Sequence, residues 1–457
     1  MKIDPTKLHL MPVDEAVEDY TVGVDYVLDL RLIEADCFGS AAHAAGLRKI
    51  GVLSDADFDS LREGLVEIVE LFRKGEFPIA RSQEDCHTAI ETHLTEKRGE
   101  VGRRIHAGRS RNDQVVAALR LFGKWEMLRL ARAVVGLGCT ALALAERHAT
   151  VPMVGRTHMQ PAMPSSVGLW MGALAEALAD DLALLWSAYD VSDQCPLGSA
   201  ASYGVPLPLD REYVSGLLGF ARVQNNSIYV ANSRGKIEAA VLGVCAQVMT
   251  DMSRYAQDLM LFTMPEFGYF SLPAEFCTGS SLMPQKRNPC AMELVRARTA
   301  TVLAEHARIL MIVRGLPTGY NRDGQETKEP FMNGLAVTRA SVGIMDATLG
   351  RLEVHEEKLL AGFHPAVFAT DRALSLVAEG KPFRDAYRQV KENLDGLLAV
   401  DPKEALARKT HAGTTGNLGL GVARSALDSH SRRIDEAASR ARGAFNELMG
   451  IDGPAGL

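Results

Sequence analysis

The distribution of proline is the feature of this sequence that most restricts its fold. Long stretches without proline separate Pro78 from Pro152, Pro208 from Pro265, Pro289 from Pro317 and Pro330 from Pro365. Proline disrupts helix interiors because it lacks a backbone N–H and its ring clashes with the preceding turn. These stretches therefore permit long, uninterrupted helices.

Apolar residues recur at helical spacing within these stretches. One stripe, in steps of three and four, comprises Ile237, Val241, Val244, Val248, Met252, Tyr255, Leu259 and Phe262. A second comprises Leu294, Ala297, Thr301, Ala304, Arg308 and Met311, and Gly315 is placed to end that helix. The first stripe keeps one face toward a core over roughly seven turns. Residues 166–189, rich in Ala and Leu, predict another helix before Pro196.

The sequence gives little support for strands, because alternating Val, Ile or Thr runs are few and aromatic residues make up only 6%. It therefore predicts an all-α protein with a central bundle of unusually long helices. We expect an N-terminal helical domain over residues 1–110, the long-helix bundle over 111–360, and a small C-terminal helical domain over 361–457.

Charge and cysteine content restrict the partners and the compartment. A formal net charge of -7 argues against a nucleic-acid partner. Seven scattered cysteines without a Cys-x-x-Cys pair are typical of reduced thiols in the cytoplasm. The opening, residues 1–5, lacks an apolar signal core, and no uninterrupted apolar run is long enough to span a bilayer. We expect a cytoplasmic protein without a membrane partner.

Two polar segments stand out against the helical pattern. Residues 108–114, Gly-Arg-Ser-Arg-Asn-Asp-Gln, precede a long helix and offer guanidinium and N–H groups to carboxylates. Taken alone, they are better explained by an ordinary helix N-cap at Ser110 or Asn112. Residues 155–161 hold Thr157 and His158. A histidine there is a candidate general acid or base near neutral pH, but a lone histidine is more often structural.

A third polar segment, residues 278–289, is more specific. Glycine and two prolines favour a loop, and a helix is expected to begin near Ala291. Lys286 and the helix N-terminus would both stabilise an alkoxide on a nearby serine. A mobile surface loop without chemistry is the alternative interpretation, but such a loop seldom combines Gly-Ser-Ser with Met-Pro-x-Lys-x-Asn.

This Gly-Ser-Ser-x-Met-Pro-x-Lys-x-Asn pattern, at residues 279–288, resembles the signature of the fumarase/aspartase superfamily. Residues 108–114, 316–328 and 382–387 are similar to the argininosuccinate lyase and δ-crystallin branch, and the likeness runs from about residue 28 to about residue 400. The resemblance implies a three-domain, all-α fold of the fumarase/aspartase type. It also implies a homotetramer whose active sites are shared between subunits.

The resemblance implies catalytic roles for particular residues. Ser280 matches the serine that abstracts the proton from the carbon beside the leaving group. Thr157 and His158 match a threonine–histidine pair, in which the histidine takes part in proton transfer to the leaving nitrogen and Glu293 matches its glutamate partner. Lys286 matches a residue that holds carboxylates and the negative charge that develops on them.

The resemblance also implies a substrate-binding set. Besides Thr157, its members are Asp25, Ser110, Arg111, Asn112, Asn288, Tyr320, Gln325 and Lys328, of which Tyr320, Gln325 and Lys328 match contacts to an arginine portion. Removing a proton beside a carboxylate forms a dianionic intermediate, which prearranged cations and N–H donors stabilise. Neither proton transfer needs a cofactor, and the sequence contains no His-x-x-x-His, Cys-x-x-Cys or dinucleotide-binding glycine motif. We predict no cofactor and no metal.

Several positions depart from the family pattern. A Trp-Gly-Gly-Arg-Phe opening is absent, and Asp25 stands where a substrate-contacting serine is usual. Residues 229–236 keep only part of the pattern, and Thr327 and Cys290 replace acidic residues. The departures concern the amine side more than the catalytic positions, so fumarate release is better supported than the identity of the amine.

Three functions remain open. The first is β-elimination of argininosuccinate to arginine and fumarate, the carbon–nitrogen lyase reaction of arginine biosynthesis. The second is release of fumarate from a different N-succinyl amine in a specialised pathway. The third is structural, crystallin-like reuse of the fold without catalysis, against which the intact set Ser280, His158, Lys286 and Glu293 argues.

Overall fold

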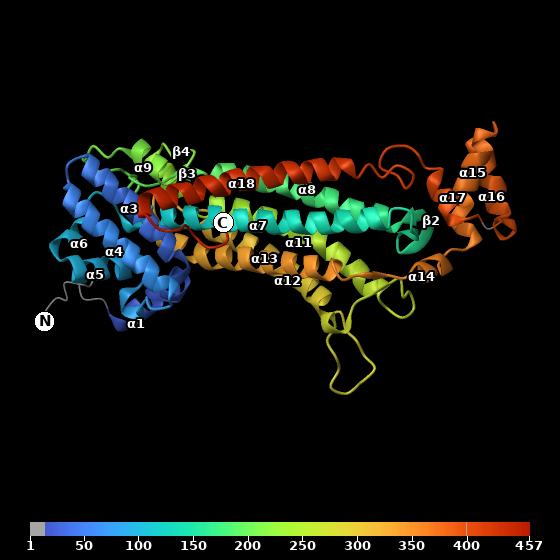
Figure 1. The fold of residues 1–457 in the computed structure, drawn as a ribbon, viewed down its shortest axis with the longest axis horizontal. Helices are drawn as coiled ribbons and strands as arrows, with labels where there is room; N and C mark the ends of the chain where they lie inside the picture. The colour runs from blue at the N-terminus through green and yellow to red at the C-terminus, as the bar shows by residue number, and fades with distance from the viewer. Residues whose placement is uncertain (1–13, 399) are drawn as a thin grey trace.

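Long helices lying side by side build the body of the computed structural model, which describes residues 14–398 and 400–457. They are α7 (Arg111–Arg147), α8 (Val167–Ser192), α11 (Lys236–Phe262), α12 (Cys290–Val313), α13 (Lys328–Leu349) and α18 (Gly421–Met449). Figure 1 shows them running along the longest axis of the molecule. The two apolar stripes and the Ala/Leu-rich segment predicted from sequence fall in α11, α12 and α8, and the all-α prediction is confirmed.

The start of α7 shows how the sequence fixes a helix boundary. Ser110 is the N-cap: its Oγ accepts the N–H of Asn112 at 3.3 Å, and Asp113 accepts the N–H of Ser110 at 3.0 Å. The other carboxylate oxygen of Asp113 accepts the N–H groups of Gly198 and Ala200 at 3.0 and 2.8 Å. This capping box ties the helix start to a distant loop.

Close packing of apolar side chains holds the bundle together. Leu128 and Leu137 of α7 are fully buried, and burying such a side chain contributes about 2 kcal/mol. Gly334 of α13 allows Leu242 of α11 to approach, since a Cβ at residue 334 would lie 2.6 Å from Leu242 Cδ2. Helix α7 is long and apolar enough to cross a membrane, but buried core helices meet the same two criteria, so this is weak evidence for a membrane span. In its most apolar 18-residue stretch, 56% is buried inside the protein.

The strands of the described chain form three two-stranded sheets that the sequence did not predict. β1 (Pro152–Thr157) and β2 (Gln160–Ser166) form an antiparallel hairpin beside the short helices α14 (Glu356–Ala361) and α17 (Pro402–Ala407). β3 (Gln194–Cys195) runs parallel to β4 (Arg222–Val223), and β5 (Phe270–Ser271) runs antiparallel to β6 (Glu353–Val354). The hairpin contains three prolines and the other strands have two residues each, so neither gives an alternating apolar pattern.

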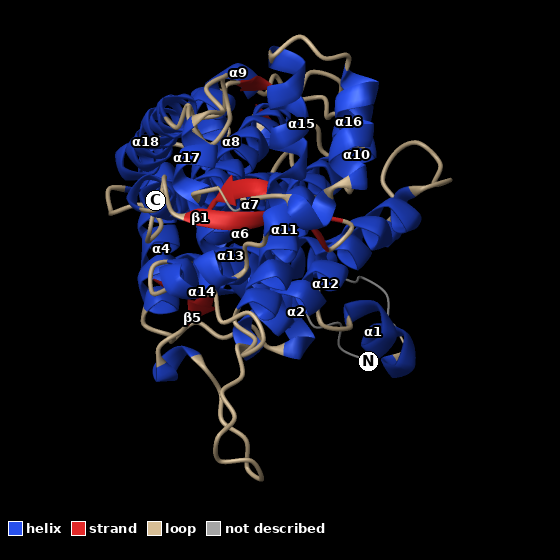
Figure 2. Cartoon of the chain, turned by 90° about the vertical axis from the view of Figure 1, so that its right-hand side faces the viewer, coloured by secondary structure: helices blue, strands red, loops and turns tan. Residues whose placement is uncertain are grey.

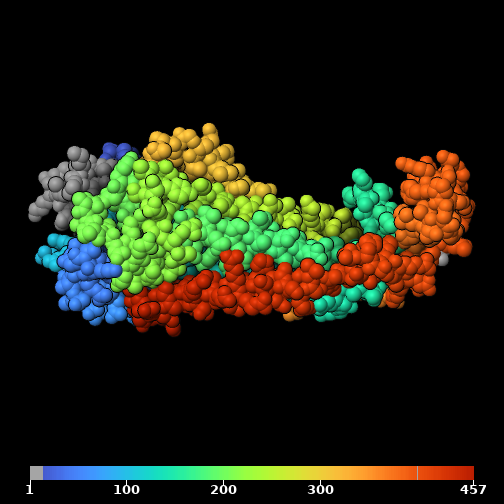
Figure 3. All heavy atoms as spheres, turned by 90° about the horizontal axis from the view of Figure 1, so that it is seen from above, coloured from blue at the N-terminus to red at the C-terminus, as the bar shows by residue number. Residues whose placement is uncertain are grey.

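Shorter helices occupy the two ends of the bundle. At one end lie α1 (Glu15–Val22), α2 (Asp25–Leu28), η1 (Asp29–Leu32), α3 (Ile33–Lys49), α4 (Asp55–Arg73), η2 (Arg81–Gln83), α5 (Cys86–Arg98), α6 (Glu100–Arg104), α9 (Arg211–Leu217) and α10 (Ser227–Asn232). Toward the other end lie α14 (Glu356–Ala361), η5 (Pro365–Phe368), α15 (Ala369–Ala378), α16 (Phe383–Glu392), η6 (Leu394–Gly396) and α17 (Pro402–Ala407). Two further turns, η3 (Ala274–Phe276) and η4 (Arg322–Thr327), precede α12 and α13. Figure 3 shows α18, in red, returning along the bundle.

Candidate active site

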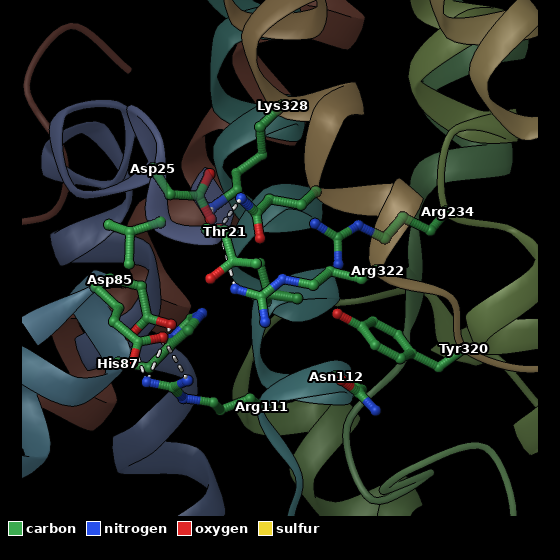
Figure 4. A pocket seen from close by; sticks show the side chains of 14 residues that line it. Thr21, Asp25, Asp85, His87, Arg111, Asn112, Arg234, Tyr320, Arg322 and Lys328 are labelled. Atoms are coloured by element: carbon green, nitrogen blue, oxygen red, sulfur yellow. Dashed lines mark hydrogen bonds and ion pairs between the residues drawn. The ribbon is translucent and has the colours of Figure 1, made fainter. Parts of the chain in front are cut away.

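A polar cavity of about 110 Å³ lies at the N-terminal end of the bundle (Figure 4). Six of the residues predicted to bind substrate line it: Asp25, Arg111, Asn112, Tyr320, Gln325 and Lys328. The most distant of them, Asp25 and Lys328, are 303 positions apart in the sequence, and they meet because the starts of α7 and α13 lie beside α2 and the 3-10 turn η4 at this end. Ser110 is not among the lining residues and acts as the cap of α7.

Lys328 is the buried charge at the centre of this cluster. Its Nζ lies 2.6 Å from Asp29 Oδ1 and 2.9 Å from Asp25 Oδ2, and its side chain is only 2% exposed. Burial alone would lower the pKa of Lys328, but Asp29 and Asp25 outweigh it and the pKa is raised. For Asp25, burial is the larger effect and raises the pKa despite Lys328. The aspartate that replaces the family's serine is thus an ion-pair partner of a predicted substrate-binding residue.

Arg111 and Asn112 occupy the first turn of α7 at the edge of the cavity. The Arg111 guanidinium lies 3.5 Å from Glu84 and 3.4 Å from Asp85, and it contacts the Thr88 hydroxyl. These partners fix its direction, so Arg111 presents a prearranged cation beside Asn112.

Eight residues that line the cavity were not predicted from the sequence: Thr21, Val22, Glu84, Asp85, His87, Val115, Arg234 and Arg322. The carbonyl of Thr21 accepts hydrogen bonds from Arg322 and Gln325 at 3.0 Å each. The run Glu84-Asp85-Cys86-His87 was the available signal, since acids beside a histidine are a common functional combination. Arg234 lies inside the segment 229–236 that was noted only for its departures.

Thr157 and His158 lie far from this cavity, at the tip of the β1–β2 hairpin near the opposite end of the bundle. Thr157 pairs with Gln160, and the two residues between them, His158 and Met159, have φ of 52° and 63°. All four side chains are exposed. The hairpin therefore holds His158 outward on a tight turn.

The loop with Ser280 forms a third, separate group. Thr278 and Asn288 exchange backbone hydrogen bonds of 2.9 Å at its base, and Figures 1 and 2 show the loop extending away from the bundle. Ser280 Oγ accepts the N–H groups of Leu282 and Met283 at 3.3 and 3.0 Å. Such donors stabilise negative charge on the serine oxygen. Lys286 is exposed on the same loop.

Glu293 is exposed in the first turn of α12, just after this loop. Within one chain, the predicted site residues thus lie in three separate places: the cavity, the hairpin, and the loop with the start of α12. The separation is large: α7, which connects the cavity to the hairpin, has 37 residues and is about 55 Å long at about 1.5 Å per residue. The parts of the chain that the structure describes do not bring His158 beside Asn112.

One group of potential metal ligands occurs among the described residues. Ligand atoms of Asp29, Cys86 and His87 lie within 4.8 Å of one another. The carboxylate of Asp29 already binds the Lys328 ammonium and the N–H of Cys86, at 2.6 and 3.2 Å. A metal ion would have to displace the ammonium, so this group does not fit a resident metal.

Comparison with known proteins assigns the family. The sequence matches a protein family described as lyase over residues 11–304. An argininosuccinate lyase of Thermotoga neapolitana is 44% identical over 380 residues, covering 83% of this chain and 96% of the relative. One of Sorangium cellulosum is 42% identical over 413 residues, covering 90% and 96%. The chain belongs to the argininosuccinate lyase family.

Members of the argininosuccinate lyase family are carbon–nitrogen lyases of the fumarase/aspartase superfamily, and the predicted resemblance is confirmed. Solved structures share the fold. EDDS lyase in complex with formate has a TM-score of 0.83 at 23% identity, over 98% of this chain and 97% of that one. A class II fumarase from Schistosoma mansoni has a TM-score of 0.70 at 17% identity, over 86% and 96%.

Proposed function

We propose that this lyase cleaves argininosuccinate into arginine and fumarate. The cavity is the main support for this proposal. Its lining includes Tyr320, Gln325 and Lys328, which match contacts to the arginine portion of the substrate, and Asn112, which matches another substrate-binding residue. Relatives 40–44% identical over most of the chain bear the name argininosuccinate lyase. The retained serine loop and hairpin supply the remaining groups.

The proposed reaction breaks one C–H and one C–N bond and forms a C=C bond. Ser280, as the alkoxide, takes the proton from the carbon next to a carboxylate, and its two N–H donors hold the oxygen before the step. Lys286, Asn288 and the start of α12 stabilise the dianionic intermediate. His158, with Glu293, delivers a proton to the departing nitrogen, directly or through a water. Thr157 binds the substrate beside it.

We propose that the active site is shared within a homotetramer. The cavity, the hairpin and the loop are separated in one chain, and other copies can bring them together. Large apolar side chains remain exposed along the bundle, among them Leu184, Leu303, Leu310, Met311 and Ile344. Exposed apolar residues on long helices favour burial against further helices. We place the enzyme in the cytoplasm, as its reduced cysteines suggest.

A related lyase acting on another N-succinyl amine is the second candidate. Asp25 favours it, because the carboxylate changes the charge of the cavity where a serine is usual. Crystallin-like reuse without catalysis is a third possibility, which an activity measurement tests directly.

The deciding assay follows fumarate released from argininosuccinate by the purified protein with a chelator present. We expect turnover without added metal or nucleotide. Ser280→Ala should lower kcat by orders of magnitude at an unchanged Tm, because the partly exposed loop serine fills no core space. No release by the wild type, or similar kcat in the two proteins, would contradict the proposal.

A further inference from the structure

His87 is a buried histidine that the proposed reaction does not use. It lines the cavity but is only 4% exposed, and its Nε2 has no hydrogen-bond partner within the described chain. Figure 4 shows it among the cavity side chains, near Asp85 and Arg111. A buried polar nitrogen without a partner is costly, so it points to a hydrogen-bond partner that enters the cavity.

Asp36 determines which nitrogen of His87 carries a proton. Its Oδ2 lies 2.8 Å from His87 Nδ1, and its carboxylate also accepts the side-chain N–H of Gln114 at 2.8 Å. Burial alone would raise the pKa of Asp36, but His87, Arg109 and Gln114 outweigh it and the pKa is lowered. An ionised carboxylate can only accept hydrogen bonds, so Nδ1 of His87 is the donor to Asp36. This bond fixes the orientation of the ring and leaves Nε2 free to bind another group.

Charges around the ring favour its cationic form. Burial lowers the pKa of His87, but Asp36, Asp85 and Asp29 outweigh it and raise the pKa above the usual 6.5. The titratable and polar groups that face the ring come from η1, α3, the start of α5 and α7: Asp29, Asp36, Asp85, Cys86, Arg111 and Gln114. In the cation, Nε2–H is a charge-assisted donor.

The lining of the cavity includes two cations that no described carboxylate pairs with. Four cations, Arg111, Arg234, Arg322 and Lys328, line it with three carboxylates, Asp25, Glu84 and Asp85, and the buried Asp29 also pairs with Lys328. Lys328 and Arg111 are paired with carboxylates, whereas no salt bridge joins Arg234 or Arg322 to a described carboxylate. An anionic ligand group would therefore be attracted here.

We propose that His87 Nε2 binds a carboxylate of the substrate, specifically the carboxylate of its amino-acid half. The amino-acid half is favoured over the succinyl half because it carries an ammonium group beside its carboxylate, and the carboxylate of Asp85, which lines the cavity near His87, would attract that cation. For the identity of the ligand the proposal rests on the proposed function. Asp36 acts through His87 as a positioning residue.

The test measures binding of L-arginine, agmatine and fumarate to the full-length protein by calorimetry. His87→Asn keeps an amide where Nδ1 meets Asp36 but removes Nε2. We expect its Kd for arginine to rise about 10- to 100-fold, as for a lost charge-assisted hydrogen bond. Binding of agmatine, which lacks the carboxylate, and of fumarate should stay unchanged.

His93→Asn is the matched control. His93 lies on the same helix, faces Glu67 at 3.5 Å and does not line the cavity, so arginine binding should be unaffected. His87→Gln returns a neutral amide near the Nε2 position and should restore part of the affinity. Wild-type affinity for arginine should fall as pH rises through the raised pKa of His87, and this dependence should vanish in His87→Gln.

Three outcomes would overturn the inference. They are equal arginine affinity in wild type and a folded His87→Asn, an equal loss for agmatine, and a loss confined to fumarate, which would assign Nε2 to the succinyl half. If His87→Asn does not fold, a pH-independent arginine affinity in the wild type overturns it. If the wild type binds arginine through His87 but releases no fumarate from argininosuccinate, the inference stands and the proposed function fails.

Discussion

The Asp25–Lys328–Asp29 cluster sets the charge at the cavity wall. With both carboxylates ionised, the cluster carries a net charge of minus one, because one buried ammonium meets two acids. A serine at residue 25 would leave it neutral. A unit charge about 4 Å away is worth on the order of 4 kcal/mol at an effective dielectric near 20, before desolvation. One residue is thus sufficient to alter the preference for a cationic amine.

Asp25→Ser should therefore reduce selectivity for the charged amine. We expect kcat/KM for argininosuccinate to fall about tenfold, and kcat/KM for an uncharged amine analogue to change little, since only the former loses an electrostatic partner. Steady-state kinetics on both substrates measures this. Asp19→Ser, on the neighbouring exposed helix where Asp19 pairs with Arg81 at 2.9 Å, is the control. If the ratio of kcat/KM for the charged substrate to kcat/KM for the uncharged analogue is equal in wild type and Asp25→Ser, Asp25 does not determine the preference for a charged amine.

At the residue scale, sequence motifs identified the cavity only in part. Arg111, Asn112, Gln325 and Lys328 belong to contiguous motifs, so the resemblance reached them. His87 was not predicted as a cavity residue. Its partner Asp36 lies 51 positions away in the sequence, and only the packing of α3 against α5 brings the pair together. The local run Glu84-Asp85-Cys86-His87 was a signal for a functional histidine, but it does not show which distant group orients the ring.

The hairpin turn is the element whose backbone is most clearly under constraint. Its two central residues, His158 and Met159, both have positive φ, a conformation that glycine or asparagine adopts more easily. The Arg156 guanidinium donates to the carbonyl of Met159 at 3.1 Å and lies 5.0 Å from the ring centroid of Phe267. These contacts hold the turn, and with it the direction of His158. The hairpin could not be predicted from the sequence, because its strands are short and contain prolines.

Substitutions at Met159 test whether turn geometry matters for turnover. Met159→Gly accepts positive φ freely, so we expect Tm to be maintained or raised and kcat to stay within about twofold. Met159→Val places a β-branched residue in that region and should lower kcat by about tenfold or more, because small misplacements of a catalytic group are expensive. Circular dichroism and kcat measurements decide. Equal kcat in the two variants would show that the turn does not position His158.

At the scale of the molecule, helical periodicity and proline spacing predicted the long helices, and the motifs predicted the family. The division into residues 1–110, 111–360 and 361–457 remains a prediction. Helix α18 belongs by sequence to the last part, yet it packs along α7 and α8. The apolar pattern of α18 predicts that one face of the helix is buried, but it does not predict which helices cover that face. The assembly of subunits could not be predicted from the sequence for the same reason, because an exposed apolar residue does not indicate what covers it.

The separation of Ser280 from His158 leads to a test of shared sites. If each site takes its serine and its histidine from different subunits, coexpressing Ser280→Ala with His158→Asn yields some sites with neither lesion. With random mixing in a tetramer, about one quarter of sites should be intact, giving up to about one quarter of wild-type kcat per site. Fumarate release by the mixed protein, purified through two different tags, measures it. The double mutant coexpressed with itself should stay inactive, because every site would carry both lesions. A mixed tetramer without rescued activity, or a fully active monomer, would show that one subunit supplies both residues.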